Sequence, residues 1–198
     1  YRYVWDDRHV PYLVADVDGK EPIDIPLDTE EKVRAHIDGD PDVYCNTHRY
    51  NIESALPYDT TELFHWHVEY SRDELQDLLL RKLEQDFGEL IDLIPGERAP
   101  SGRLIYLDIV GSKKTLRVGK ELAIRRALSE SHLYSSCFYI DRDLDDSGTI
   151  HKFHLHGAGW GHGVGLCQVG ATVMAQLGFD YQQILTHYYK GVAIERLY

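Results

Sequence analysis

The chain has 198 residues, of which 43% are hydrophobic and 27% charged, a composition typical of one well-packed globular domain. Its formal net charge of −12 comes from 21 basic and 33 acidic residues. This balance argues against nucleic acid and anionic membrane surfaces as partners, because both are bound mainly through Lys and Arg. No apolar run approaches the ~20 residues of a membrane span, so we expect no transmembrane segment in this chain.

Short elements alternate with polar loops in the first half of the chain. The clearest signal is Ser71-Arg72-Asp73-Glu74, a capping box followed by leucines at helical spacing, with Gly88 as the expected residue after the helix. The expected elements are an extended segment and strand over residues 4–18 ending in an Asp18-Gly19 turn, a short surface helix capped by Asp28 or Thr29 with Val33 and Ile37 buried and Gly39 beyond its end, an irregular stretch over 40–59, a strand over Phe64–Tyr70, and the helix from Ser71 towards Phe87.

The second half combines antiparallel hairpins with three helices. We expect strands over 103–110 and 115–118, a helix over 120–128 with Leu122, Ala123, Ala127 and Leu128 facing inward, strands over 134–140 and 149–156, helices over 168–177 and 181–189, the second capped by Asp180, and a last strand over 192–197. These patterns predict an α+β fold with one domain and mostly antiparallel strands.

An acidic joint, D-R-D-L-D-D-S-G, connects the strands expected over 134–140 and 149–156. Asp141, Asp143 and Asp145 alternate as in a calcium loop, but an EF-hand needs Gly at its sixth position and Glu at its twelfth. Asp146 and Lys152 stand there instead. We therefore expect a solvated hairpin rather than a calcium site.

The most informative stretch is G-A-G-W-G-H-G-V-G-L-C-Q-V-G, residues 157–170, with six glycines in fourteen positions. We call it the glycine turn. Flexible linkers are rich in Gly and Ser and lack the Trp, Val, Leu and Cys found here. It is not a P-loop, because no Lys follows the glycines. The composition therefore predicts an ordered turn that presents Trp160 and His162 beside exposed backbone N–H groups.

The glycine turn, followed by Met174-Ala175, Gly178, Ile184-Leu185 and His187-Tyr188-Tyr189, resembles the carboxy-terminal signature of the SpoIID/LytB family. The resemblance is specific over residues 157–194 and weaker back to Pro11-Tyr12-Leu13. It implies work on peptidoglycan outside the cytoplasm, in the cell envelope or periplasm. The family's sporulation members cleave glycan strands as lytic transglycosylases, and its LytB members are described as amidase enhancers.

The family's catalytic glutamate lies in a Y-L-x-G-V-V-x-x-E-M type of motif, which this chain does not match. Tyr12-Leu13-Val14 followed by Glu21 is a poor match. The resemblance thus implies that residues 1–198 form the carboxy-terminal portion of a single SpoIID/LytB-like domain, with the catalytic glutamate expected before Tyr1. We expect no catalytic residue in this chain and no activity of this chain alone.

The resemblance and the residue types together predict a glycan-binding surface. An indole face and bare backbone suit sugars, and a neutral or amino-sugar polymer is not repelled by the net charge. The predicted substrate-binding residues are Gly159, Trp160, Gly161, His162, Gly163, Gln168 and Tyr188. Two functions stay open: a transglycosylase when the whole domain is present, or a non-catalytic module that positions glycan strands for a separate cell-wall amidase.

A metal-dependent protein is the third alternative. Cys45 and His48 form a C-x-x-H pair, which is half of a typical zinc site. The face of a predicted strand that carries His65, His67 and Glu69 offers further ligands, as do His154, His156 and His162. For the first three we favour a half-exposed strand with its polar residues outward over a metal site. The three cysteines, Cys45, Cys137 and Cys167, are an odd number and do not indicate a disulfide framework.

Overall fold

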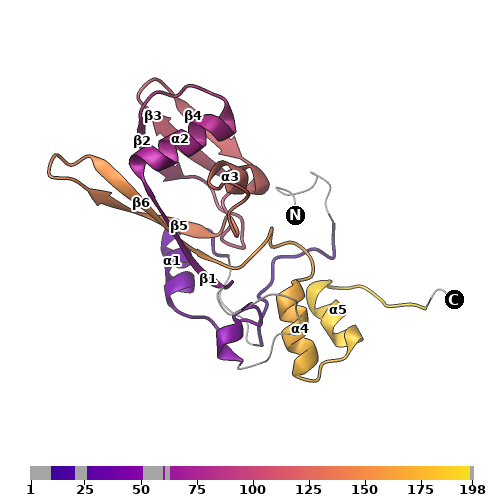
Figure 1. The fold of residues 1–198 in the computed structure, drawn as a ribbon. Coiled ribbons are helices and arrows are strands. Elements are labelled where there is room, and N and C mark those ends of the chain that lie inside the picture. Colours follow the sequence, from indigo (N-terminus) through magenta and orange to yellow (C-terminus); the bar gives the residue numbers. More distant parts are fainter. Residues whose placement is uncertain (1–9, 21–25, 51–59, 61–62, 197–198) are drawn as a thin grey trace.

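The computed structural model describes residues 10–20, 26–50, 60 and 63–196, and within them it forms five α-helices and six antiparallel strands. The elements are α1 (Glu30–Asp38), the 3₁₀ helix η1 (Thr47–Arg49), β1 (His65–Ser71), α2 (Arg72–Leu83), β2 (Leu90–Pro95), β3 (Tyr106–Gly111), β4 (Thr115–Gly119), α3 (Glu121–Ala127), β5 (Phe138–Leu144), β6 (Ile150–Ala158), α4 (Gln168–Gln176) and α5 (Tyr181–Tyr188). The strands form two sheets, ordered β1–β6–β5 and β2–β3–β4 (Figure 1). The predicted α+β class is confirmed.

Helix starts follow the caps that the sequence predicts. The Ser71 hydroxyl accepts from the Glu74 N–H, and the Glu74 carboxylate accepts from the Ser71 N–H, which completes the capping box of α2. Thr29 caps α1 and Asp180 caps α5 in the same way, by accepting a backbone N–H in the first turn. Because each cap is a local interaction, these three helix starts were predictable from sequence.

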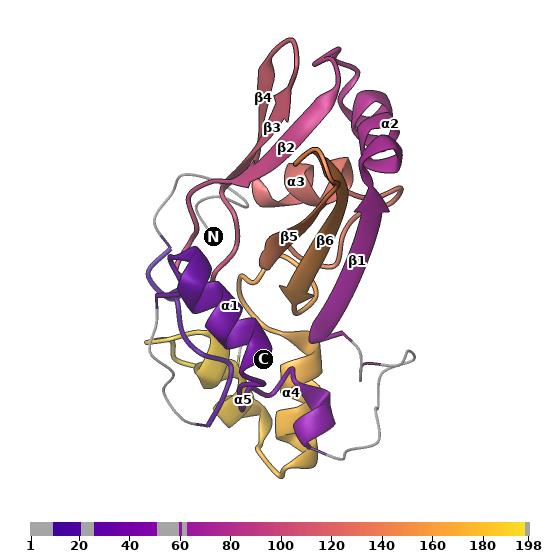
Figure 2. The same cartoon turned by 90° about the vertical axis from the view of Figure 1, so that its left-hand side faces the viewer.

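The main hydrophobic core joins the two sheets and packs α2 and α3 against them (Figure 1). Its largest fully buried side chains are Phe87, Phe138 and Phe153. A second cluster packs α1 against β5 and β6, and a third joins α4 and α5 to Tyr44. Figure 2 shows α4 and α5 side by side at the end of the molecule away from β2, β3 and β4.

Several expected elements differ from the structure. Residues 10–18 form no strand, and residues 192–196 are irregular, so the last strand is absent from the described part of the chain. Helix α2 ends at Leu83 rather than near Phe87, because Glu84 takes a left-handed conformation with φ of 53°. Strand β2 was not anticipated, since L-I-D-L-I-P lacks the period-2 alternation of a half-buried strand.

Helix α3 buries only part of the face that was expected: Ala127 and the following Leu128 are buried as predicted, whereas Leu122 and Ala123 are exposed. Leu122 is 44% exposed, whereas Ile124 is fully buried and lies beside Ala127. The buried face also carries an ion pair, in which the Arg125 guanidinium donates to the Glu121 carboxylate over 2.9 Å. A hydrophobic pattern could not predict this face, because it includes the buried ion pair of Glu121 and Arg125.

The acidic joint is part of a hairpin, as expected, but its first four residues belong to β5, which begins at Phe138 rather than at Tyr134 and ends at Leu144. One carboxylate oxygen of Asp145 accepts from the Ser147 N–H, the Ser147 hydroxyl and the Thr149 N–H. This oxygen therefore serves the turn itself, which is a common use of Asp at such positions.

Candidate functional site

The glycine turn is an ordered segment held by its neighbours, as predicted. The Trp66 indole N–H of β1 donates to the Gly159 carbonyl over 3.1 Å, and the Gly159 N–H donates to the Phe64 carbonyl over 2.7 Å. Gly157 has no room for a side chain, because an added Cβ would lie 2.1 Å from the Trp66 ring. The Gly161 N–H donates to the Tyr134 carbonyl over 2.8 Å, so the turn is fixed at several points.

Alternate residues of the turn take a left-handed conformation. Gly159, Gly161, Gly163 and Gly165 have φ values of 71°, 99°, 66° and 74°. Only glycine adopts this region without appreciable strain, which explains their spacing in the sequence. Trp160, between the first two, is 47% exposed. The alternation thus keeps a large indole ring at the surface on a tightly curved backbone.

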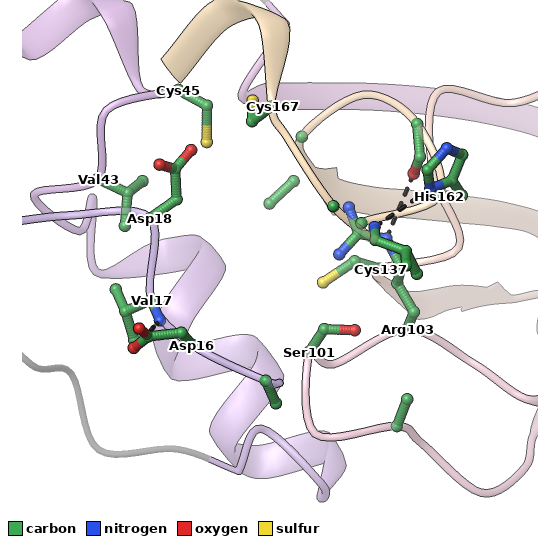
Figure 3. A pocket seen from close by; sticks show the side chains of 18 of the residues that line it. Asp16, Val17, Asp18, Val43, Cys45, Ser101, Arg103, Cys137, His162 and Cys167 are labelled. Atoms are coloured by element: carbon green, nitrogen blue, oxygen red, sulfur yellow. Dashed lines mark hydrogen bonds between the residues drawn. The ribbon is translucent and has the colours of Figure 1, made fainter. Parts of the chain in front are cut away.

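Arg103 supports the turn from the loop that leads into β3. Its Nε–H donates to the Gly161 carbonyl over 3.3 Å, and its guanidinium lies close to Gly163 (Figure 3). Sequence reasoning missed Arg103, because a single Arg at the start of an expected strand carries no signal of its own. Its position beside the turn follows only from the tertiary fold.

A cavity of about 620 Å³ lies beside the turn. Its walls come mainly from four segments far apart in sequence: residues 13–18, the loop 99–105, the glycine turn over 158–169, and His187 and Tyr188 at the end of α5. Single residues of other segments complete them, among them Cys45, Glu121 and Cys137. All seven residues predicted to bind substrate line it, namely Gly159, Trp160, Gly161, His162, Gly163, Gln168 and Tyr188. The volume falls in the usual range for small-ligand sites, about 300–1,000 Å³.

His162 is held in one orientation by the turn. The Val164 N–H donates to its Nδ1 atom over 3.1 Å. Nδ1 is thus an acceptor, which places the proton of the neutral ring on Nε2. Burial lowers the pKa of His162, and nearby Arg103 lowers it further against the opposing charge of Glu121. At neutral pH the residue is therefore an uncharged imidazole with an Nε2–H donor.

Tyr188 has a different setting from that of an exposed sugar contact. Its hydroxyl donates to the Asp18 Oδ1 atom over 2.7 Å, and the His187 Nε2 atom lies 3.3 Å from the same oxygen. Burial and the Asp18 charge raise the pKa of Tyr188. Asp18 was predicted only as part of a turn, so its role as the partner of α5 was also missed. The pair joins residues 170 positions apart in the sequence.

The two residues of the predicted C-x-x-H metal pair, Cys45 and His48, do not belong to a common group of potential metal ligands. Cys45 lines the cavity, but His48 is exposed on η1 and is absent from the groups of potential metal ligands among the described residues. Cys45 instead lies beside Cys167, and its hydrogen bond with Cys167 and its burial raise the pKa of the Cys45 thiol. The third cysteine, Cys137, is buried in the cluster under α1.

His162 lies at the cavity, whereas the other predicted metal ligands lie on the exposed side of the β1–β6–β5 sheet. His67 stacks on His156 with ring centroids 4.6 Å apart, while His154 bonds to the Asp143 carboxylate over 2.9 Å. Potential ligand atoms of His67, Glu69 and His154 lie within 4.8 Å of one another. His65 is not among them, since its ring contacts the Ile37 carbonyl at 2.9 Å. This face is the half-exposed strand surface that the alternation predicts.

Comparison with known families assigns most of the chain. The model of a domain of unknown function, DUF8618, matches residues 1–165. The chain belongs to this family. The residues that DUF8618 matches include the cavity walls over 13–18 and 99–105 and most of the glycine turn, whereas α4 and α5 lie beyond them. The family's description gives no activity.

Shorter stretches are similar to two larger bacterial proteins. An uncharacterized protein of Brachyspira hyodysenteriae (strain ATCC 49526 / WA1) is 53% identical over 49 residues, which is 25% of this chain and 12% of that protein. The amidase enhancer of Bacillus subtilis (strain 168) is 42% identical over 43 residues, 22% of this chain and 6% of that protein. The chain therefore spans only a small part of either relative, and the SpoIID/LytB resemblance is supported in part.

None of the helices that the structure describes combines the length and the apolar character that crossing a membrane requires.

Proposed function

We propose that this chain binds glycan strands of the bacterial cell envelope in the cavity beside the glycine turn, as a non-catalytic module that works with a cell-wall amidase. The observation that carries the proposal is the convergence of all seven predicted substrate-binding residues on one cavity. The short similarity to an amidase enhancer supports the same direction. On this proposal the chain acts outside the cytoplasm as a portion of one SpoIID/LytB-like domain.

The cavity offers the groups that amino sugars need. Trp160 supplies a half-exposed indole face, on which the apolar face of a sugar ring packs at low entropic cost. The glycine backbone allows a ligand to approach closely, and its carbonyl and N–H groups suit hydroxyl and acetamido groups. Arg103 supplies a cation at the cavity wall. A guanidinium pairs well with carboxylates, and the lactyl group of muramic acid carries one on strands from which the stem peptide has been removed.

Each of the three carboxylates at the cavity has at least one oxygen bonded to a protein partner, which favours binding over cleavage. Glu121 is buried in its ion pair with Arg125, and Asp16 lies 2.6 Å from the Lys190 ammonium. Asp18 accepts through Oδ1 from Tyr188. A general acid for glycoside cleavage needs a proton near neutral pH. Burial raises the pKa of the Asp16 carboxyl, but the hydrogen bond and charge of Lys190 outweigh it and leave the pKa lowered, which opposes such a role.

The test is binding of this chain to soluble N-acetylglucosamine oligomers and to purified glycan strands, measured by calorimetry and by sedimentation with the strands. The Trp160→Ala variant should bind at least roughly tenfold more weakly, equivalent to ~1.4 kcal/mol. Tyr181→Ala is the matched control, because Tyr181 is 65% exposed and lies outside the cavity wall. Equal binding by wild type and Trp160→Ala would remove the proposal.

The same samples test the enzyme alternative. Incubation of wild type with purified glycan strands, followed by mass spectrometry of the released fragments, should give no anhydro-sugar products. Release of such products that depends on Asp18 would replace the binding module with a transglycosylase whose acid lies in this chain.

A further inference from the structure

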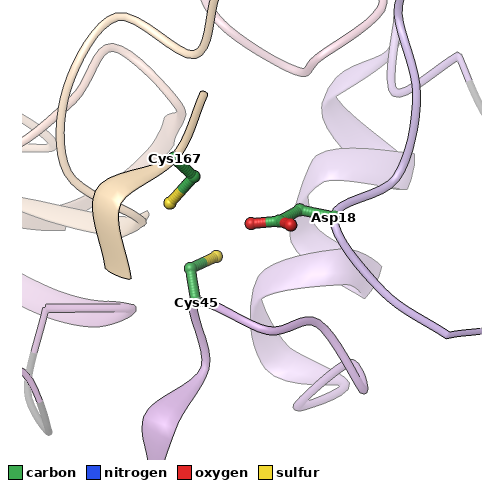
Figure 4. Close-up of side chains that lie close together, drawn as sticks. All are labelled: Asp18, Cys45 and Cys167. Atoms are coloured by element: carbon green, nitrogen blue, oxygen red, sulfur yellow. The ribbon is translucent and has the colours of Figure 1, made fainter. Parts of the chain in front are cut away.

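Three potential metal ligands converge at one end of the cavity. Asp18 comes from the amino-terminal segment, Cys45 from the loop before η1, and Cys167 from the last position before α4. One ligand atom from each lies within 4.8 Å of the others, and Figure 4 shows the three side chains pointing toward a common centre. Because the segments are distant in sequence, this convergence is a product of the fold.

The Asp18 carboxylate is oriented so that one oxygen is occupied and the other is not. Oδ1 accepts from the Tyr188 hydroxyl over 2.7 Å, with the His187 ring 3.3 Å away. Oδ2 is buried and has no hydrogen-bond partner among the described residues. A buried carboxylate oxygen without a partner is costly, so it calls for a cation or a donor. In known metal sites, hydrogen-bond donors on one carboxylate oxygen, such as Tyr188 on Asp18 Oδ1, orient the carboxylate for metal binding.

The backbone around Cys167 favours negative charge at this position. Cys167 is the cap of α4, and its sulfur accepts from the Gly170 N–H over 3.4 Å. The first turn of a helix presents unpaired N–H groups that stabilise anionic ligands. Gly170 also gives Asp18 its room, because an added Cβ there would lie 2.4 Å from Oδ2. One glycine thus serves both a sulfur and a carboxylate of the cluster.

We propose that Asp18, Cys45 and Cys167 form a zinc site, in which Asp18 Oδ2 and the two sulfurs bind one Zn²⁺ ion. Two sulfurs and one oxygen suit Zn²⁺, whereas Mg²⁺ and Ca²⁺ take oxygen ligands. Tetrahedral zinc with Zn–S distances of ~2.3 Å holds its ligand atoms about 3.5–4 Å apart, within the spread seen here. Binding releases the thiol protons and leaves thiolates.

Three protein ligands leave the fourth position of zinc open. Asp18, Cys45 and Cys167 all line the cavity, so this position faces the same space as the glycine turn. Zinc sites with an open position bind water or a ligand group there. The proposal goes beyond glycan binding and stands without it, since metal uptake is measured on the protein alone.

The first measurement is metal content after purification under reducing conditions without chelator. Wild type should hold about one zinc ion per chain, and Cys45→Ser and Cys167→Ser should each lose it. Cys137→Ala is the matched control, because it removes the remaining cysteine, which is not one of the three proposed ligands. Retention of zinc by Cys137→Ala together with loss in the other two supports the site. Equal zinc in all four proteins overturns it.

Cobalt titration of the metal-free protein identifies the ligands directly. Co²⁺ should give the near-ultraviolet charge-transfer bands of thiolate ligation in wild type and Cys137→Ala, but not in the Cys45 and Cys167 variants. Tyr188→Phe keeps all three ligands and removes only the Tyr188 hydrogen bond to Asp18 Oδ1, so it should weaken Zn²⁺ binding by roughly tenfold. Wild-type spectra without these bands contradict the proposal.

The competing use of the two thiols is a disulfide between Cys45 and Cys167. Thiol labelling under reducing-agent-free conditions, read by mass spectrometry, separates the two. Protection of both cysteines by Zn²⁺ that is reversed by a chelator supports the metal site. Protection that resists the chelator and is reversed only by a reductant assigns the pair to a disulfide and overturns it.

Discussion

The Arg103 guanidinium packs directly against the backbone of Gly163, where an added Cβ would lie 2.3 Å from the central guanidinium carbon. The Arg103 side chain therefore occupies the space that any other residue at position 163 would need. Because that obstacle is the mobile end of a long side chain, a substitution displaces Arg103 rather than breaking the fold.

Gly163→Ala should lower glycan binding more than stability. The left-handed conformation costs an alanine ~1 kcal/mol, and the new methyl group moves Arg103 from the cavity wall. Gly148→Ala is the matched control, since Gly148 is also left-handed, with φ of 80°, has nothing within 4 Å of an added Cβ and lies outside the cavity wall. Denaturant melts should give similar losses for both variants, while calorimetry should show weaker binding only for Gly163→Ala. Equal binding by the two variants contradicts the role of Arg103.

His162→Asn should separate the structural role of His162 from its binding role. The Asn carbonyl can still accept from the Val164 N–H, as Nδ1 does, but the Nε2–H donor is lost. We expect stability within ~1 kcal/mol of wild type and binding reduced by roughly tenfold. The measurement pairs a thermal melt with a glycan titration. A variant that melts early, with binding lost in proportion to unfolding, would make His162 a residue of the fold alone.

Acidification should destabilise the protein through His36. Burial lowers the pKa of this imidazole below its ordinary 6.5, and the neighbouring His65 and Arg103 lower it further. The unfolded chain then takes up a proton at a higher pH than the folded chain. Stability is therefore full above about pH 6.5 and falls as the pH drops towards the folded-state pKa.

His36→Gln should show a smaller loss of unfolding free energy between pH 7.5 and 5.5 than wild type, measured by urea melts. His156 and His162 have pKa values lowered in the same direction, so the variant retains part of the effect. An identical pH dependence in wild type and His36→Gln would assign the loss to those two residues or to others.

Glu121→Ala should be among the most damaging single changes. Its partner Arg125 is 7% exposed and would be left as a buried cation without its counter-charge. Breaking such a pair costs about 3–5 kcal/mol. Asp86→Ala breaks the surface pair with Lys113 and serves as the control. Urea midpoints should shift strongly for the first variant and little for the second. Similar shifts would mean that burial does not govern the Glu121 pair.

The sequence predicts those features that depend on neighbouring residues. Ser71, Thr29 and Asp180 are each close in sequence to the N–H groups that they cap. The glycines indicate left-handed backbone by themselves, because a residue without Cβ adopts positive φ without strain. These residues were identified without a structure.

Features that depend on distant contacts were not predictable in this way. Asp18 and Tyr188 meet across 170 positions, and the face of α3 is set by the buried pair of Glu121 and Arg125 rather than by its leucine. Cys45 was recognised as a possible ligand, but its neighbour is Cys167 and not the nearby His48. The C-x-x-H spacing predicts His48 as the neighbour of Cys45, whereas the tertiary fold places Cys167 beside it.

The cavity closes only when both ends of the described chain are in place. The Lys190 N–H donates to the Tyr12 carbonyl over 3.2 Å, and the Lys190 ammonium reaches Asp16. The ribosome adds α5 and Lys190 after the residues of both sheets, and joining segments so far apart carries a loop-closure cost. A chain that stops before α5 would therefore lack the side of the cavity wall that His187 and Tyr188 form.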